Sequence, residues 1–284
     1  METLKTLESE SINTCVTSPP YWGLRDYNGE KEQLGLEATP QEFVDNLVAV
    51  FREVKRVLRK DGTLWLNLGD SYNAARNGGH AGGSKQNHKK YLQRSGENVV
   101  GLKPKDLIGI PWRVAFALQQ DGWYLRQDII WHKPNPMPES VKDRCTKAHE
   151  YIFLLSKSPK YYYDNEAIKE DAKFPGGPTA AHAIRKGADD PKMQTRGGLH
   201  KIGANPKRNK RSVWTITTKP YKEAHFATFP KDLIEPCVLA GCPEGGTVLD
   251  PFGGSGTTAQ VANDSQRDSI MCELSAEYIE IAKK

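Results

Sequence analysis

A glycine-rich turn near the C-terminal end of the sequence constrains the fold more than any other feature. Residues 247–250, Thr-Val-Leu-Asp, form a short apolar segment typical of a buried strand, and residues 256–263 have the pattern of a helix. Gly253, Gly254 and Gly256 lie at the turn between them. Such glycines let the backbone bend sharply and approach a ligand without a side-chain clash. The unit is typical of α/β sheets, which bind ligands at the carboxyl ends of their strands. The turn lacks the lysine of a phosphate-binding P-loop, which argues against ATP hydrolysis.

The rest of the sequence alternates in the same way between strand-like and helix-like segments. Further strands are expected at residues 12–17, 63–68, 123–132, 150–156 and 269–273, and further helices at residues 40–60, 106–120, 231–240 and 275–282. This alternation predicts an α/β fold, with a mostly parallel sheet that helices cover on both faces.

Local signals predict where some of these elements begin, turn or end. Thr39 and Glu42 form a capping box at the start of the first long helix, and Asp61-Gly62 is expected to end that helix. Ser158-Pro159 predicts a turn that pairs strand 150–156 with residues 161–163.

Composition excludes several classes of protein. Hydrophobic residues make up 37% of the chain and charged residues 26%, which is a globular mixture rather than that of a disordered or fibrous chain. No apolar run approaches the ~18 residues of a membrane helix, and the N-terminus lacks a secretory signal pattern. The five cysteines form no CxxC pair, so neither a disulfide framework nor a zinc site is indicated. We therefore expect a cytoplasmic protein with no metal site and no membrane partner.

Positive charge is concentrated in two segments. Residues 76–105 carry 7 basic and 1 acidic residue, and residues 171–222 carry 12 basic and 3 acidic residues. Because the net charge of the whole chain is +5, the remaining residues must sum to −10. An acidic body with two basic segments suggests a polyanion such as nucleic acid as partner. A solubilising loop is the alternative for either segment taken alone.

A second motif follows the first predicted strand. Ser18-Pro19-Pro20-Tyr21 comes directly after residues 12–17, so it too is expected at the carboxyl edge of the sheet. The Ser18 hydroxyl and the Pro19 carbonyl are hydrogen-bond acceptors, the prolines stiffen the loop, and Tyr21 offers a flat face for stacking. Two acceptors beside an aromatic face suit an exocyclic amino group on a ring. A proline-rich turn with a core tyrosine is the alternative interpretation.

Together the two motifs resemble those of the DNA amino-methyltransferases, which use S-adenosylmethionine. Residues 250–256, Asp-Pro-Phe-Gly-Gly-Ser-Gly, resemble the cofactor loop of that family, and residues 17–22, Thr-Ser-Pro-Pro-Tyr-Trp, resemble its catalytic loop. The similarity continues at residues 23–27, 129–134 and 225–230. The catalytic loop precedes the cofactor loop, as in the circularly permuted β group of the family.

The resemblance implies an S-adenosylmethionine-dependent methyltransferase (Rossmann-like) fold and assigns the site residues. It implies Ser18, Pro19, Pro20 and Tyr21 as catalytic residues. It implies that the cofactor is bound by Asp250, Pro251, Phe252, Gly254, Gly256, Thr257, Thr258 and Glu273. Glu273 would accept hydrogen bonds from the ribose hydroxyls, and its alternative role is to cap the helix that starts near Ser275. Similar proteins carry a Gly-Asp pair before the first strand, where this sequence begins at Met1-Glu2, so the contacts to the adenine are expected to be altered or to be made by other residues.

The same resemblance divides the chain and suggests its substrate. Residues 1–164, with a basic loop at 70–105, would form the catalytic part, residues 165–211 a target-recognition insertion, and residues 212–284 the cofactor-binding part. The partner would be double-stranded DNA with the target base flipped out. In the family, Ser before Pro-Pro-Tyr favours cytosine N4 and Asp favours adenine N6. Cytosine-N4 methylation is the first hypothesis and adenine-N6 methylation the runner-up.

Other interpretations remain open on the sequence alone. A cognate restriction endonuclease is a possible partner, and the oligomeric state is not indicated. A DNA-binding protein that has lost catalysis is disfavoured by the intact motifs, and failure to bind cofactor would revive it. A methyltransferase that acts on RNA or protein is disfavoured only by the family resemblance.

Overall fold

The computed structural model describes residues 2–23, 33–73, 102–172, 206–218 and 229–283. Residues 24–27 and 225–228 of the family-like segments lie outside these ranges. So do most of the two basic segments. The described residues fall into two compact units, one formed by Met1–Tyr163 with Ser212–Lys284 and one by Asp164–Arg211. The second unit coincides within one residue with the insertion expected at 165–211, whose role in target recognition stays a prediction.

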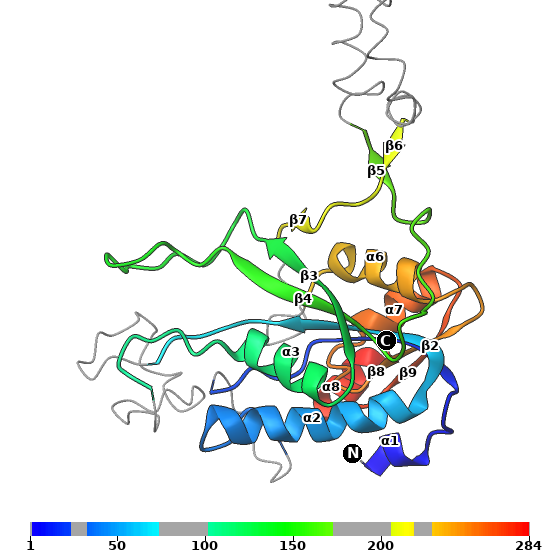
Figure 1. Cartoon of the computed structure of the whole chain (residues 1–284), viewed down its shortest axis with the longest axis horizontal. Helices are drawn as coiled ribbons and strands as arrows, with labels where there is room; N and C mark the ends of the chain where they lie inside the picture. Colours follow the sequence, from blue (N-terminus) through cyan, green and yellow to red (C-terminus); the bar gives the residue numbers. More distant parts are fainter. Residues whose placement is uncertain (1, 24–32, 74–101, 173–205, 219–228, 284) are drawn as a thin grey trace, which may run out of the picture. The chain divides into compact units, whose positions relative to one another are not determined.

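A seven-stranded sheet organises the first unit (Figure 1). Its spatial order is β7 (Val213–Thr215), β3 (Tyr124–His132), β4 (His149–Ser156), β2 (Leu58–Leu68), β1 (Ile12–Thr17), β8 (Thr247–Asp250) and β9 (Asp268–Met271). Only β4 runs antiparallel to its neighbours in this sheet, and the other four pairings are parallel. The predicted α/β fold with a mostly parallel sheet is therefore confirmed.

Helices cover both faces of this sheet (Figure 1). The described α-helices are α1 (Glu2–Thr6), α2 (Pro40–Val57), α3 (Ile110–Gln120), α6 (Lys231–Gly241), α7 (Thr257–Asp264) and α8 (Ala276–Ala282). Helices α2 and α3 pack together on one face, and α6 and α7 on the other. In α2, Phe43, Leu47, Phe51 and Val54 are fully buried, as their helical spacing predicts. None of the described helices is both long and apolar enough to span a membrane.

Two helix boundaries differ from those expected. Helix α2 begins at the predicted capping box, with mutual hydrogen bonds between Thr39 and Glu42, but it ends at Val57. The Asp61-Gly62 pair lies inside β2, where the strand bulges out of register with β1. Helix α3 begins at Ile110 rather than at residue 106, because Gly109 has a left-handed backbone and Pro111 stands in the first turn.

The hairpin expected after Ser158-Pro159 is wrong. Strand β4 pairs with β2 and β3, and residues 161–163 form no strand. The backbone N–H of Tyr162 donates instead to the carbonyl of Asp61, and the Tyr163 ring stacks on Trp65 with centroids 6.2 Å apart. Stacking of the partly exposed Tyr163 ring on the buried Trp65 ring, together with this backbone hydrogen bond, replaces the expected backbone ladder.

The second unit contains a short antiparallel ribbon. It pairs β5 (Glu170–Asp171) with β6 (Lys207–Arg208). The Glu170 carboxylate forms ion pairs with Arg208 at 2.9 Å and with Arg211 at 2.7 Å. These pairs hold together the two chain segments that lead into and out of residues 173–205, which lie outside the described ranges.

Candidate active site

Sheet topology brings the two sequence motifs to one edge. Strands β1 and β8 are parallel neighbours, with Thr14 opposite Val248 and Cys15 opposite Leu249. Their carboxyl ends therefore lie side by side, and the Ser18–Tyr21 loop and the glycine turn both leave the sheet there. The two motifs lie more than 200 residues apart in the sequence and become neighbours only through this pairing. This is the permuted arrangement that the resemblance implies.

The Asp250 side chain ties these two loops together. It is 1% exposed and accepts hydrogen bonds from the Thr17 hydroxyl and the Thr258 hydroxyl, each at 2.6 Å, and from the Phe252 backbone N–H at 3.0 Å. Thr17 directly precedes the predicted catalytic loop, Ser18–Tyr21, and Thr258 lies in the first turn of α7, so one buried carboxylate fixes both. Burial raises the pKa of Asp250 to about 6, although the two threonine hydroxyls and the Phe252 N–H act to lower it.

This buried carboxylate predicts a pH-dependent stability. The pKa of Asp250 is about 6 in the folded chain and about 3.9 in an unfolded one, so the folded state binds the proton more tightly. The resulting stabilisation is fully present only below the unfolded-state pKa of about 3.9 and is lost as the pH rises through about 6. The unfolding free energy of the wild type, relative to Asp250→Asn, should fall by about 1 kcal/mol between pH 5 and pH 7. Urea denaturation of both proteins at each pH measures this difference, and a difference that is constant or grows with pH would contradict it.

The glycine turn has the backbone shape and the open space that a bound ligand requires. Gly254 has φ +51°, and a Cβ placed there would meet nothing closer than the Phe252 carbonyl oxygen at 4.0 Å. Gly256 has φ +85° and is the N-cap of α7, where a Cβ would come within 3.1 Å of Ala282. The turn therefore needs glycine at 256 for packing and leaves an open flank at 254.

Glu273 connects this turn to the end of the next strand. Its carboxylate accepts from the Gly254 N–H at 2.7 Å and from the Ser275 N–H at 2.9 Å. It follows β9, next to β8 in the sheet, so its position fits a ribose-binding acid. The alternative role expected from the sequence, a contact at the start of the next helix, is also present in the Ser275 bond.

The remaining predicted cofactor residues surround the same turn. Pro251 is buried, Phe252 is half-buried and packs against the hydrophobic core, and the Thr257 hydroxyl lies 3.3 Å from the Ser255 hydroxyl. A glycine without close neighbours at 254, an acid just after the adjacent strand and the start of α7 are groups that suit a nucleoside with a charged tail. These residues fit S-adenosylmethionine.

The predicted catalytic loop is held against the neighbouring strand β2. Pro19 is buried, and the Ser18 hydroxyl donates to the side-chain oxygen of Asn67 at 3.2 Å. The Tyr21 ring lies on the backbone of Gly69, where an added Cβ would stand 2.4 Å from a ring carbon. Glycine at 69 is therefore required for the ring to occupy this place.

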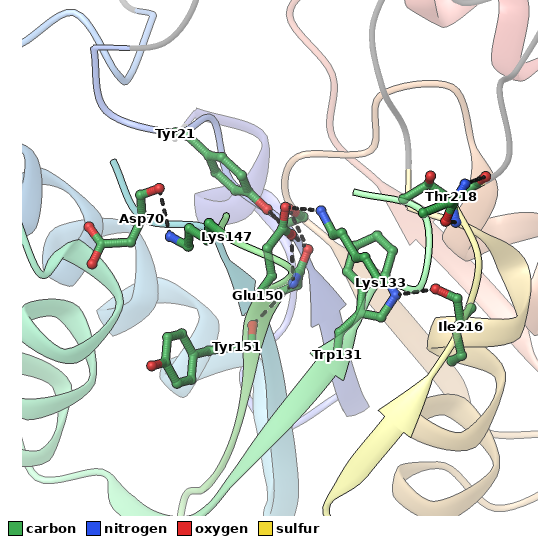
Figure 2. Close-up of polar contacts among 12 residues, drawn as sticks. Tyr21, Asp70, Trp131, Lys133, Lys147, Glu150, Tyr151, Ile216 and Thr218 are labelled. Carbon is green, nitrogen blue, oxygen red and sulfur yellow. Dashed lines mark hydrogen bonds and ion pairs between the residues drawn. The ribbon is translucent and has the colours of Figure 1, made fainter. Parts of the chain in front are cut away.

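Sequence reasoning missed a polar cluster behind this loop (Figure 2). The Tyr21 hydroxyl donates to Glu150 at 2.6 Å, and Glu150 forms an ion pair with Lys133. Asn67 donates its side-chain N–H to the Tyr151 carbonyl at 3.0 Å and lies 3.4 Å from Glu150. The available signal was a lone asparagine in the apolar run 63–68 and a glutamate at the start of an apolar strand. Neither signal shows in the sequence which side chain the residue contacts in the fold.

Two lysines flank this cluster at the same edge of the sheet. The Lys133 ammonium lies 4.2 Å from the centre of the Trp131 ring, and Lys147 donates to the Asp70 carbonyl at 2.7 Å. Burial lowers the pKa of Lys147, while the nearby Asp70 and Glu150 carboxylates act in the opposite direction. Both ammonium groups therefore have polar partners within the protein.

Three nearby residues have structural contacts. Trp22 is 8% exposed and donates its indole N–H to the Glu37 carbonyl, and Trp131 donates to the Ile216 carbonyl at 2.9 Å. The His132 ring nitrogen lies 3.1 Å from the Thr215 hydroxyl. A cavity of about 600 Å³ at the opposite edge of the sheet contains none of the predicted site residues; it is lined by Ser9, Glu10, Arg52, Lys55, Arg56, Asp121 and Lys157.

Comparison with known proteins agrees with this geometry. Residues 12–284 match the N6/N4 methyltransferase family model, described as DNA methylase. The chain is 49% identical over 282 residues to the Type II methyltransferase M.Cfr9I of Citrobacter freundii, covering 99% of this chain and 83% of the relative. It is 50% identical over 285 residues to the Type II methyltransferase M.SmaI of Serratia marcescens, covering 100% of this chain and 87% of the relative.

Solved structures show the same fold. The PvuII DNA methyltransferase (cytosine-N4-specific) superimposes with a TM-score of 0.64 at 19% identity, covering 99% of this chain and 81% of that one. A Thermus thermophilus protein in complex with S-adenosyl-L-methionine gives a TM-score of 0.60 at 25% identity, covering 99% and 88%. The family match over nearly the whole chain, the two loops at one sheet edge and the glycine turn lead to one conclusion: this chain belongs to the N4/N6 family of DNA amino-methyltransferases, which use S-adenosylmethionine.

Proposed function

We propose that this enzyme transfers a methyl group to the N4 amino group of a cytosine flipped out of double-stranded DNA. The observation that carries the proposal is the serine at position 18, held beside β2 and followed by Pro19-Pro20-Tyr21. Serine at this position favours cytosine over adenine in the family. One structural neighbour, the PvuII enzyme, is named as cytosine-N4-specific.

The protein's task in this reaction is to orient a weak nucleophile. The lone pair of an exocyclic amino nitrogen is delocalised into the ring. Hydrogen bonds from its N–H groups to the Ser18 hydroxyl oxygen and the Pro19 carbonyl would favour a pyramidal nitrogen with an available lone pair. S-adenosylmethionine, when bound, supplies an electrophilic methyl group, so orientation and electrostatics are what this chain must provide. No cysteine adduct is required, and Cys15, fully buried on β1, fits a core role.

Tyr21 is proposed to form a wall of the base pocket. Its ring rests on the Gly69 backbone and its hydroxyl is tied to Glu150, so the ring is held rigidly at the edge where Ser18 lies. A rigid aromatic ring is a suitable stacking partner for a flipped base. The loop itself therefore combines two acceptors and one aromatic face.

The basic insertion is proposed to bind the DNA around the target. Of its arginines, Arg185 and Arg196 lie outside the described residues, whereas Arg208 and Arg211 are paired with Glu170. Phosphate contact by the lysines and arginines of this segment is compatible with its charge. The relatives are named Type II methyltransferases, and we extend that context, including a cognate endonuclease, to this chain as part of the proposal.

Nucleoside mass spectrometry tests the choice of base. DNA from cells that express the enzyme should contain N4-methylcytosine, and DNA from cells that express Ser18→Ala should contain far less. N6-methyladenine without N4-methylcytosine would reverse the assignment in favour of the runner-up, adenine-N6 methylation. Methylation-aware sequencing of the same DNA would give the recognition sequence.

A further inference from the structure

The Ser18 hydroxyl lies beside a buried amide whose orientation is set by other groups. Asn67, the penultimate residue of β2, is 4% exposed. Its side-chain nitrogen faces the Tyr151 carbonyl oxygen at 3.0 Å and a Glu150 carboxylate oxygen at 3.4 Å. A carbonyl and a carboxylate paired with a lysine only accept hydrogen bonds, so the N–H₂ end of the amide must point toward them. The Oδ1 end therefore points toward the catalytic loop.

The hydroxyls of Tyr21 and Ser18 both lie near the Asn67 Oδ1 atom, but only the Ser18 hydroxyl uses it as its hydrogen-bond acceptor. The Tyr21 hydroxyl lies 2.6 Å from Glu150 and 3.3 Å from Asn67 Oδ1. A phenol carries one proton, and the shorter, charge-assisted bond to the carboxylate takes it. The Asn67 oxygen is left as the acceptor for the Ser18 hydroxyl at 3.2 Å. The ion pair between Lys133 and Glu150 holds this order of donors and acceptors in place.

This order decides what Ser18 can offer to a substrate. A serine hydroxyl has one proton to donate and two lone pairs that accept. We propose that Asn67 is a positioning residue that takes the Ser18 proton and so holds the serine oxygen as an acceptor for the target amino group. A serine free to rotate could donate to the amino nitrogen and occupy the lone pair that must receive the methyl group. The inference rests on the proposed role of Ser18.

A double-mutant cycle tests whether Asn67 acts through Ser18. The single-turnover rate of methyl transfer is measured for wild type, Asn67→Ala, Ser18→Ala and the double variant, with radiolabelled S-adenosylmethionine and unmethylated bacterial genomic DNA. Asn67→Ala should lower the rate on the order of 10-fold in the wild-type background and by less than about 2-fold in the Ser18→Ala background, because coupled residues are not additive.

A matched asparagine provides the control. Asn73 is also 4% exposed, and its side-chain N–H₂ donates to the Leu102 and Lys103 carbonyls. These bonds lead away from the catalytic loop, so Asn73→Ala should change the rate by the same factor in both backgrounds. Should Asn67→Ala fail to fold, Asn67→Leu, which fills a similar volume, enters the same cycle with the same criteria.

The possible outcomes separate the two claims. Equal losses from Asn67→Ala in both backgrounds, or no loss in either, would overturn the positioning role while the function of Ser18 stands. An unchanged rate for Ser18→Ala would instead refute the role of Ser18 in the proposed function, and this inference with it. A loss of rate from Asn67→Ala that appears only when Ser18 is present would support both the role of Ser18 and the positioning role of Asn67.

Discussion

Gly254→Val is expected to abolish binding of S-adenosylmethionine. Gly254 has φ +51°, a backbone conformation that a β-branched residue strongly resists. Its open flank, where a Cβ would meet only the Phe252 carbonyl at 4.0 Å, is the space that a ligand approaching the turn would use. The valine would fill this space and displace the N–H bound to Glu273. Isothermal titration calorimetry should show an affinity weakened by at least about 100-fold.

Gly245→Val is the matched control for backbone strain. Gly245 has φ +69° and also has no neighbour within 4 Å of an added Cβ, but it precedes β8 at the opposite edge of the sheet. Both variants should lose roughly 1–2 kcal/mol of stability, because each forces an L side chain into the left-handed region. Only Gly254→Val should lose the cofactor. Equal affinities of the two variants for S-adenosylmethionine would show that the turn at Gly254 does not bind the cofactor.

Ser18→Ala is expected to reduce methyl transfer by about 100-fold while leaving cofactor affinity unchanged. The serine oxygen is proposed to act only on the target amino group, and loss of one directed hydrogen bond at a reacting centre costs on this order. The variant also removes the hydrogen bond to Asn67, so stability should fall by only about 1 kcal/mol. Single-turnover assays at saturating cofactor measure the rate, and calorimetry measures the affinity.

Ser156→Ala is the control for this second prediction. Ser156 is fully buried at the end of β4, at the opposite edge of the sheet, and its hydroxyl donates to the Ser158 carbonyl. Its loss should destabilise the chain without changing the rate of the folded enzyme. A Ser18→Ala enzyme that transfers methyl groups as fast as wild type would remove the basis for assigning catalysis to this loop.

Periodicity and local signals predicted the main elements of this chain but misplaced some boundaries. The capping box at Thr39 acts within four residues, so it could be recognised directly. The Asp61-Gly62 pair was interpreted as a helix end because such pairs often mark turns. In the fold, Leu58 is already fully buried on β2 opposite Ile12, and pairing with β1 overrides the local preference. Strand β7 has only three residues and exists through its parallel pairing with β3.

The residues of the candidate site, too, were only partly predictable from the sequence. The glycine turn and the Ser-Pro-Pro-Tyr loop were predictable because each is a continuous motif at the end of a strand. Asn67 and Glu150 were not, because they lie 83 residues apart and meet only through the antiparallel register of β2 and β4, which sets Leu68 opposite Tyr151. Sheet register depends on which strands become neighbours, and that choice minimises the free energy of the whole chain rather than of one segment.

The placement of two loops at strand ends of an α/β sheet, one loop rich in glycine and one stiffened by proline, could be inferred from the amino-acid sequence alone. Short-range chemistry was sufficient, since backbone freedom at glycine and rigidity at proline are properties of single residues. The bonds by which the Asp250 carboxylate joins Thr17 to Thr258, and by which the Asn67 oxygen faces Ser18, became visible only in the three-dimensional fold. Hydrogen-bond direction depends on which donors and acceptors the fold brings within about 3 Å of each other, and residues distant in sequence supply them.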